Sequence, residues 1–458
     1  MDLKPPKTPT TRWQGPRWLV VAAAVPLIIA SPAAAAVEAE TAYVFNTLLF
    51  LIGGFLVMWM AAGFAMLEAG LVRSKNVAEI CLKNITLYAV AGLLYFLLGY
   101  NLMYTGVDGG FVGSLGFWTA DDAAALAASG ADFSGVEATY AASSDWFFQM
   151  VFVATAASIV SGTVAERIKL FPFLIFTAVL TGLIYPVQGA WEWGAGWLDA
   201  RGFADFAGST LVHSTGGWAA LAGAILLGAR RGKYGPDGRV RPMPGSSLPL
   251  ATLGTFILWL GWFGFNGASQ LALASAADAA AVANIFANTN TAAAAGCLAA
   301  TLVSKLLYDK VDLTMTLNGA LAGLVSITAE PLTPSLPWAM LIGGIGGVLV
   351  VFAIPFFDRL KIDDVVGALS VHLVCGIWGT MAVPITNHDP SISFATQALG
   401  VAAIGAFVFT ASFAVWFALK SLVGIRLSAE DEEMGSDLAE LGLEAYPEFG
   451  RGSQKLVM

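Results

Sequence analysis

Two histidines lie inside long apolar stretches of the sequence, where a polar side chain is energetically costly unless it has a partner. His213 and His372 are two of the three histidines in a chain of 458 residues. An imidazole can donate one hydrogen bond and accept another, and in water it exchanges a proton near neutral pH. Two such rings facing each other could hold a small polar molecule or relay a proton. The alternative for each ring is a structural hydrogen bond between helices.

The spacing before each histidine predicts that the two rings are neighbours. His213 follows Asp205, and His372 follows Asp364, by the same eight residues. Eight residues of helix rise about 12 Å. If the two helices enter a hydrocarbon layer of about 30 Å from opposite faces, both imidazoles come close to its midplane. Polar groups at that depth are costly unless they face a lumen, so the pair indicates a pathway through the membrane.

The composition places these residues in an all-α polytopic membrane protein. The chain is 57% hydrophobic and 12% charged, with a mean hydropathy of +0.72, which exceeds the apolar content that a water-soluble core requires. The net charge of −9 gives no indication of nucleic-acid binding. The three cysteines lie in or beside apolar segments without a CxxC or CxxH pattern, so neither a metal site nor a cofactor is predicted.

Eleven apolar stretches are long enough to cross a bilayer once an amino-terminal signal is removed. Residues 1–36 carry four basic residues, then an apolar run and a small-residue segment, which is the pattern of a cleaved signal peptide. The alternative is an additional, uncleaved helix. We expect a transmembrane domain over residues 37–427 and a cytoplasmic tail over 428–458. The stretches lie near residues 44–71, 84–105, 146–166, 170–190, 207–229, 249–268, 280–304, 313–330, 337–357, 365–386 and 396–423.

The distribution of basic residues predicts the orientation of these helices. Of the 23 Lys and Arg residues, all but Arg201 and the four in residues 1–36 fall in one set of alternate segments between the spans. Basic residues resist translocation, so the mature amino terminus is expected outside and the carboxyl terminus in the cytoplasm. Helices one to five and six to ten then form two halves of opposite orientation, an inverted repeat followed by one extra C-terminal helix. The Asp-x7-His spacing and a Phe-Asn pair, at 45–46 and 265–266, occur in both halves.

Several motifs around the histidines resemble the signature of the ammonium transporter (Amt/Mep/Rh) family, in its bacterial Amt form. The similarity extends over nearly the whole mature chain and keeps the order and spacing of the motifs. They are FQMVF at 148–152, WGAGWL at 193–198, DFAGSTLVH at 205–213, GWFGFNGAS at 261–269, VHLVCGIWG at 371–379 and GIRLS at 424–428.

The resemblance implies roles for five residues outside the histidine pair. Phe152, Trp193 and Ser269 look like the family's outer vestibule, in which two aromatic rings and a hydroxyl recruit the ammonium cation. Asp205 resembles the family aspartate that stabilises this binding site. Phe152 and Phe265 resemble the stacked pair that closes the pore beneath it. Without the motifs, aromatic residues at this level would be assigned to the interfacial belt of a membrane protein.

A comparison of free energies indicates whether ammonium or ammonia passes such a gate. Moving a bare cation into a narrow apolar lumen costs tens of kcal/mol in the Born limit, a rough upper estimate. Deprotonating an amine of pKa ~10 at neutral pH costs about 4 kcal/mol. Neutral ammonia is therefore the expected passenger, and His213 and His372 offer it a donor and an acceptor. The resemblance implies that the same pair relays the proton separately.

The resemblance also implies the setting of the protein. Ammonium or its analogue methylammonium is the expected substrate, transported across the inner, or plasma, membrane by a homotrimer with one pore in each subunit. The acidic tail at 428–458 partly resembles the family's regulatory tail, so a PII-type signalling protein is an expected partner at the cytoplasmic face. No HExxH, GxSxG or P-loop motif is present, and we expect no enzymatic activity.

Two other functions remain open from the sequence. The protein could be a Rh-like channel for neutral ammonia or carbon dioxide, although Trp193 and Ser269 favour a vestibule that binds a cation. It could instead be an ammonium sensor that signals through its tail while transporting little, although the sequence contains no kinase or other output domain.

Overall fold

The computed structural model describes residues 38–129 and 139–449, and over these residues its regular structure is helical. Within this part of the chain, ten helices are long and apolar enough to cross a membrane, and Leu313–Ile327 is a shorter apolar helix. This confirms the all-α membrane architecture. The count of eleven spans stays a prediction, because the shorter helix has the place of one expected span without its length. The predicted signal peptide, residues 1–36, lies outside the described residues.

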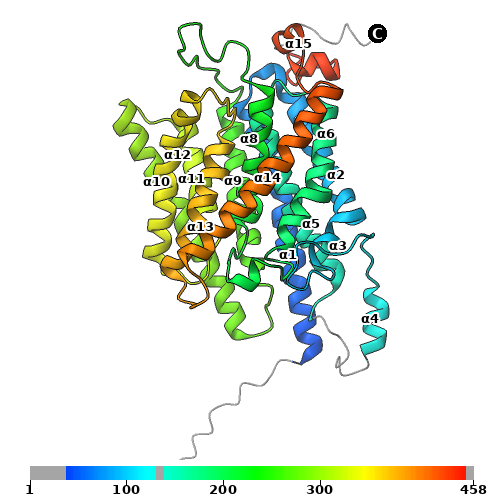
Figure 1. The fold of residues 1–458 in the computed structure, drawn as a ribbon. Coiled ribbons are helices and arrows are strands. Elements are labelled where there is room, and N and C mark those ends of the chain that lie inside the picture. Colours follow the sequence, from blue (N-terminus) through cyan, green and yellow to red (C-terminus); the bar gives the residue numbers. More distant parts are fainter. Residues whose placement is uncertain (1–37, 130–138, 450–458) are drawn as a thin grey trace, which may run out of the picture. The chain divides into compact units, whose positions relative to one another are not determined.

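The first half of the bundle contains two helices that are interrupted by π-helical turns. The segment before α8 is also π-helical, at Ser209–Ser214. A long loop that contains the short helix α4 (Asp122–Ser129) separates α3 from α5 (Figure 1). The helices are α1 (Ala39–Leu71), α2 (Val77–Leu94) with a π-turn at Tyr95–Gly99 leading into α3 (Tyr100–Tyr104), α5 (Ala142–Val164), α6 (Leu170–Val179) with a π-turn at Leu180–Ile184 leading into α7 (Tyr185–Ala190), and α8 (Thr215–Leu227).

The second half repeats the π-helical entry before its last helix, at Leu369–Val374. After that helix come α14, α15 and a π-helical turn at Asp437–Leu441, and α15 lies near the carboxyl-terminal end of the described chain (Figure 1). The helices are α9 (Leu248–Gly267), α10 (Ala276–Tyr308), α11 (Leu313–Ile327), α12 (Leu336–Arg359), α13 (Cys375–Thr386), α14 (Phe394–Leu422) and α15 (Ala429–Met434).

Glycines allow α1 and α9 to pack with their backbones almost in contact. A Cβ atom on Gly254 would lie 2.3 Å from the backbone nitrogen of Leu67, and one on Gly70 would lie 2.4 Å from the backbone nitrogen of Ala251. Neither backbone can move aside, so a larger residue would force the helices apart. Small residues at helix contacts replace the hydrophobic driving force that lipid cannot supply. This close contact holds the first helices of the two predicted halves together.

The two histidine segments are built alike, which supports the two-half organisation. Asp205 precedes the π-helical turn that contains His213, and Asp364 precedes the turn that contains His372; each carboxylate accepts hydrogen bonds from backbone N–H groups at the start of its turn. The Phe-Asn pairs are different. The pair at 45–46 lies near the beginning of α1, whereas the pair at 265–266 lies near the end of α9. These are not equivalent positions, so reading this pair as a trace of the repeat was wrong.

A more informative repeat lies at the ends of the third helix of each half. Thr163-Val164-Ala165-Glu166 closes α5, and Thr328-Ala329-Glu330 follows α11. Both glutamates accept hydrogen bonds that organise the following chain: Glu166 from Arg73 and Arg230, and Glu330 from Asn387 and the backbone N–H of Thr333. In each half, therefore, a glutamate follows the third helix.

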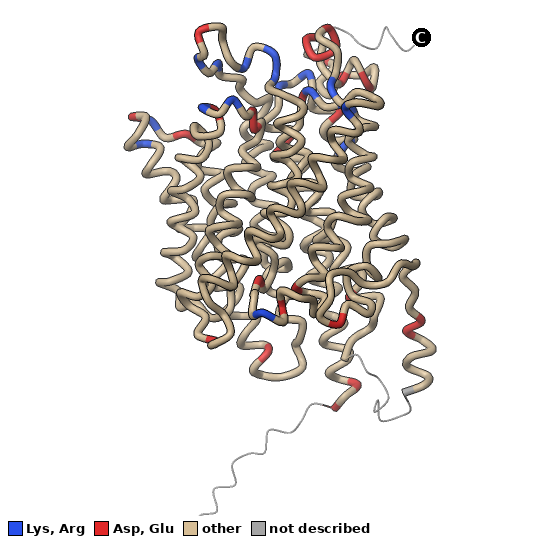
Figure 2. Tube along the Cα trace, in the orientation of Figure 1, with Lys and Arg blue, Asp and Glu red and all other residues tan. Residues whose placement is uncertain are grey.

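Figure 2 shows that most Lys and Arg residues gather at the end of the bundle that carries α15, which we call the basic end. Their partners there include buried carboxylates. The Arg230 guanidinium lies 2.8 Å from Asp363 and 2.9 Å from Glu166, which is also bound by Arg73 at 2.5 Å. Burial alone would raise the pKa of Asp363, but the hydrogen bonds and charge of Arg230, together with Arg167, hold that pKa well below its ordinary value.

The segment that follows α14 is bound to this basic end by three carboxylates. Glu432 accepts hydrogen bonds from the Arg426 side chain and the backbone N–H of Arg231, each at 2.7 Å. Asp437 accepts from the backbone N–H of Glu79 at 2.8 Å, and Glu440 accepts from the first backbone N–H of α6 at 2.7 Å. The acidic residues of the tail therefore satisfy donors that would otherwise stay open at the ends of α2 and α6.

Candidate functional site

A cavity of about 400 Å³ opens between α3, α5 and the end of α9, and we call it the vestibule. Phe152, Trp193 and Ser269, the three residues expected to recruit a cation, all line it. They come from α5, from the loop after α7 and from the turn after α9, so segments far apart in the chain meet there. The structure thus brings together the three residues that the motifs singled out.

The aromatic rings of the vestibule are held in place by neighbouring groups. The Trp193 indole meets Phe152 edge-on, with ring centroids 5.9 Å apart at 82°. Its Nε1 donates to the backbone carbonyl of Asp205 at 3.0 Å, which fixes the ring. The Ser269 hydroxyl donates to the Phe265 carbonyl at 2.7 Å, so its oxygen lone pairs remain available as acceptors. Such a site can offer π faces and an acceptor oxygen to a small cation.

Asp205 lies behind the vestibule rather than in its wall. Its two carboxylate oxygens accept from the backbone N–H groups of residues 208–211, at 2.8 to 3.2 Å, and the side chain is fully buried. Burial raises the pKa of this carboxyl, while the four backbone hydrogen bonds act in the opposite direction. Its direct contacts therefore position the segment that leads to His213, and its effect on a cation can only be an indirect one.

Two phenylalanines close the inner side of the vestibule. Phe152 and Phe265 stack with ring centroids 4.0 Å apart at an interplanar angle of 29°, and both side chains are buried. The ring of His213 lies on the other side of Phe265, with centroids 5.2 Å apart. The two stacked rings therefore lie between the vestibule and His213, at the place where the motifs predict a gate.

The histidines are in direct contact, as their spacing predicted. Nδ1 of His213 and Nδ1 of His372 are 3.2 Å apart, and the ring centroids are separated by 5.2 Å at 24°. One of these nitrogens must carry the hydrogen and the other must accept it. Trp262 stacks on His213 at 4.9 Å and limits its rotation. Nε2 of His213 has no hydrogen-bond partner among the described residues, so it is available to a passing molecule.

A further carboxylate in the vestibule wall escaped the sequence reasoning. Asp145 begins the face of α5 that also carries Phe148 and Phe152, and its carboxylate accepts a hydrogen bond from the Tyr100 hydroxyl. Its side chain is buried, and within the described residues it forms no ion pair. The signal was present, because an acid seven residues before a gate residue lies on the same side of a helix.

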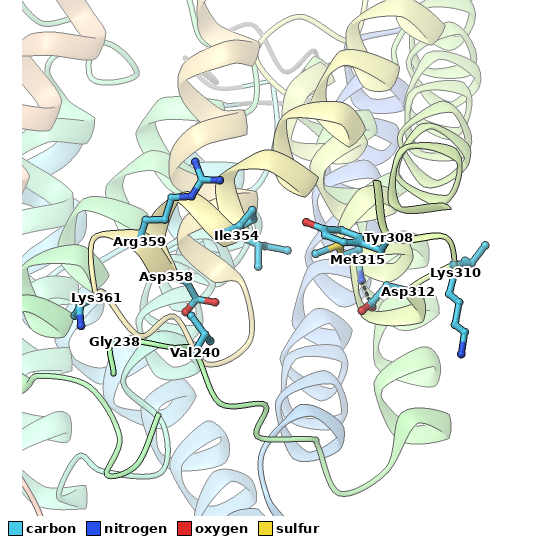
Figure 3. Close-up of a pocket in the computed structure, with 12 residues that line it drawn as sticks. Gly238, Val240, Tyr308, Lys310, Asp312, Met315, Ile354, Asp358, Arg359 and Lys361 are labelled. Atoms are coloured by element: carbon cyan, nitrogen blue, oxygen red, sulfur yellow. Dashed lines mark hydrogen bonds between the residues drawn. The ribbon is translucent and has the colours of Figure 1, made fainter. Parts of the chain in front are cut away.

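Another cavity, of about 680 Å³, lies at the basic end, between the ends of α10, α11 and α12. Figure 3 shows that Lys310, Arg359 and Lys361 extend away from one another around it rather than toward a common point. Its acids are already bound, since Asp358 pairs with Lys233 and Asp312 caps α11. Over the described residues, no group of three His, Cys, Asp or Glu side chains could hold a metal ion. The vestibule is thus the better-formed ligand site.

Comparison with known proteins points to one family. The model of the Ammonium Transporter Family matches residues 48–446. The chain is 42% identical over 428 residues to the ammonium transporter Amt2 of Archaeoglobus fulgidus, covering 87% of each protein. It is also 42% identical over 408 residues to a putative ammonium transporter of Synechocystis, covering 88% of this chain and 90% of that one.

Solved structures of similar proteins have the same fold. A structure titled Sensor Amt Protein superposes with a TM-score of 0.80 at 35% identity, covering 88% of this chain and 98% of the other. Mep2 of Candida albicans superposes with a TM-score of 0.75 at 27% identity, covering 85% and 88%. Similarity in sequence and in structure thus extends over the whole bundle that contains the vestibule, the stacked phenylalanines and the histidines.

Proposed function

The chain belongs to the ammonium transporter family and is a multi-pass membrane transporter rather than an enzyme, and on this premise we propose a route for its substrate. Ammonium is recruited in the vestibule and loses a proton there. Ammonia then passes the Phe152–Phe265 gate and moves along His213 and His372, while the proton follows separately. The observation that carries this proposal is the unbroken order of cavity, stacked gate and paired imidazoles.

Recruitment of a cation fits the chemistry of the vestibule wall. A cation over the face of an aromatic ring such as Trp193 gains on the order of 0.5 to 2 kcal/mol, and the Ser269 oxygen can accept one of its hydrogen bonds. Asp145 adds a negative charge about 10 Å farther out along the same face of α5, by helix geometry. Aromatic faces would also accept a neutral molecule. The carboxylate is what makes this wall selective for a cation.

Passage of ammonia rather than ammonium follows from the closed gate. The stacked rings leave no room for a hydration shell, and the lumen beyond them is lined by buried residues. A bare cation would lose most of its solvation there, whereas ammonia needs one or two hydrogen bonds. The paired imidazoles offer both a donor and an acceptor. Their mutual Nδ1 contact also gives a path along which a proton can move between the rings.

The placement of the protein follows from the same premise. The vestibule is proposed to face outward and the basic end the cytoplasm, which satisfies the positive-inside rule. Residues 1–36 act as a cleaved signal, residues 37–427 form eleven spans in the inner membrane, and residues 428–458 are a regulatory tail. Large apolar side chains exposed on α1, α10 and α14 are suited to lipid or to neighbouring subunits of a homotrimer. A PII-type signalling protein would contact the basic end.

Uptake of labelled methylammonium into proteoliposomes tests the proposal. The double substitution of Trp193→Ala and Ser269→Ala removes a π face and an acceptor oxygen, so KM should rise by about 10- to 100-fold. The maximal rate should change much less, because neither residue lies in the pore beneath the gate. Trp197→Ala is the matched control, since that indole does not line the vestibule. Unchanged KM in the double variant, with uptake following free ammonia alone, would favour a Rh-like gas channel instead.

Sensing is the second candidate function, and one observation favours it. The structure titled Sensor Amt Protein resembles this chain, and the acidic tail is bound through Glu432 and Asp437 to the ends of the helices. An ammonium signal could pass from the bundle to the tail through these contacts. Saturable methylammonium binding together with negligible uptake by the intact protein would identify a sensor. Uptake that saturates in parallel with binding would identify a transporter.

A further inference from the structure

A third, much smaller cavity lies on the opposite side of the histidine pair from the stacked phenylalanines. It measures about 10 Å³ and is lined by His372 from the π-helical turn, Glu68 from α1, and residues of α5 and α11. A volume of this size holds about one water molecule when polar groups are present to bind it. Nδ1 of His372 faces His213, so Nε2 is the ring nitrogen left for this cavity.

Glu68 is a buried carboxylate with one oxygen uncommitted. Its Oε2 accepts from Nδ2 of Asn84 at 3.0 Å and from the Ser161 hydroxyl at 2.7 Å. Its Oε1 is buried and has no hydrogen-bond partner within the described residues. A purely structural carboxylate in such a dry place would have both oxygens satisfied. A buried acid in a membrane span that lines a cavity beside the pathway indicates a functional group.

Within the described residues Glu68 forms no ion pair, and it shares the charge of Lys83 with Glu79. Lys83 and Glu79, both on α2, form an ion pair at 3.7 Å, and the Lys83 ammonium also approaches the Ser161 carbonyl at 3.4 Å. His372 is the titratable group on the remaining side. Beyond the ion pair, the backbone N–H of Glu79 is bound by Asp437 of the tail. Polar groups therefore continue from the small cavity toward the basic end.

We propose that Glu68 receives the proton from the histidine pair, through one water molecule, and returns it to ammonia at the cytoplasmic side of the pore. The inference rests on the proposed function. In the first step the histidine pair carries one added proton. An N–H bond of His372 breaks with its electron pair left on nitrogen, so the ring becomes neutral. The water takes this hydrogen and gives one of its own to Oε1 of Glu68, which forms one O–H bond on the water, breaks another and forms the O–H bond of the acid. In the second step ammonia takes that hydrogen, an N–H bond forms, and the electron pair of the O–H bond returns to the carboxylate. Atoms and charge balance without any other reactant.

Glu68→Gln tests the step because it keeps the shape and the acceptor oxygen but cannot hold an exchangeable acid proton. In proteoliposomes, the ammonium-driven current should fall by about 100-fold, the size of effect that a general acid or base contributes. Cation recruitment should persist, so saturable methylammonium binding should match that of the wild type. Infrared difference spectra recorded on a pH change should contain a carboxyl band in the wild type that is missing in the variant.

Controls separate a proton role from a structural one. Asn84→Ala and Ser161→Ala each remove a donor to Oε2 but keep the carboxylate, so they should lower thermal stability while leaving most of the current. Glu68→Asp should recover part of the current. The inference is overturned if Glu68→Gln carries the wild-type current, or if the wild type takes up methylammonium without any current. A wild type that takes up no methylammonium would instead refute the proposed function, and this inference with it.

Discussion

Buried carboxylates at the basic end and in the vestibule differ in whether they have a cationic partner. Toward the basic end, Asp363 and Glu166 share the guanidinium of Arg230 at 2.8 and 2.9 Å, so the chain itself neutralises them. In the vestibule, Asp145 is bound by the Tyr100 hydroxyl and, over the described residues, by no cationic side chain. The first arrangement stabilises the fold. The second leaves a carboxylate without a cationic partner, which fits the proposed recruitment of a cation.

The largest expected effect is a loss of stability on removing a carboxylate that is already paired with a buried arginine. Asp363→Asn leaves Arg230 buried with half of its partners, which should cost about 3 to 5 kcal/mol of unfolding free energy. The pKa of Asp363 lies below its ordinary value in the folded state, so its contribution is present above about pH 4 and lost as acid protonates it. Thermal unfolding in detergent, measured at neutral and acidic pH, checks this.

The contrast between the basic end and the vestibule predicts that the dependence of stability on pH differs between the wild type and Asp363→Asn. Wild-type protein should lose stability on acidification below about pH 4, whereas Asp363→Asn should be less stable at neutral pH and flatter in the acidic range. Asp358→Asn is a suitable control, because that side chain is more exposed and pairs with Lys233. It should change the unfolding temperature much less. Equal profiles for all three proteins would mean that the buried network contributes little.

Asp145→Asn should act on affinity instead of stability. The amide keeps an acceptor for Tyr100 but removes the charge, so KM for methylammonium should rise by about tenfold, equivalent to 1.4 kcal/mol. The unfolding temperature should stay the same or increase, because an unpaired buried charge is lost. Uptake kinetics and thermal unfolding of the same preparation measure both quantities. A large loss of stability with unchanged KM would place Asp145 in the same class as Asp363.

Tyr100→Phe gives the smallest expected effect and separates the charge from its hydrogen bond. The substitution removes the hydroxyl that donates to Asp145 but keeps the carboxylate and the ring. A single net hydrogen bond contributes about 0.5 to 1.5 kcal/mol to stability, so the unfolding temperature should fall slightly. KM should not rise, because the cation then becomes the carboxylate's main partner. A rise in KM as large as in Asp145→Asn would show that geometry, not charge, matters.

Much of the architecture could be predicted from the sequence, because a small number of strong physical constraints determines how a chain can cross a membrane. The contact between His213 and His372 followed from equal spacing after an aspartate and from alternating charge. The pairing of Phe152 with Phe265, which we propose as the gate, depended on resemblance, since nothing in apolar periodicity distinguishes a gate from ordinary packing. The Phe-Asn pair misled because two residues recur by chance and carry no direction along a helix.

Residues that act across helices were harder to foresee. Asp145 becomes part of a site only because Tyr100, from a different helix, and the end of α9 enclose it. Glu68 stands visibly within an apolar span, but its free oxygen and its shared cavity with His372 depend on how α1, α2 and α5 pack. The π-helical turns before α8 and α13 were not predicted from the sequence, and they alter the direction of the side chains that they contain.

The backbone hydrogen bonds of Asp205 have a consequence for how much variation the chain can tolerate. Because its carboxylate anchors residues 208–211, the number of residues up to His213 sets the rotational position of the imidazole as well as its depth. One inserted residue in an α-helical segment turns every later side chain by about 100°. An insertion between Asp205 and His213 would therefore direct the imidazole into a neighbouring helix, although every residue named in the pathway would still be present. The proposed pathway thus depends on the number of residues between Asp205 and His213. Single-residue substitutions do not test this dependence.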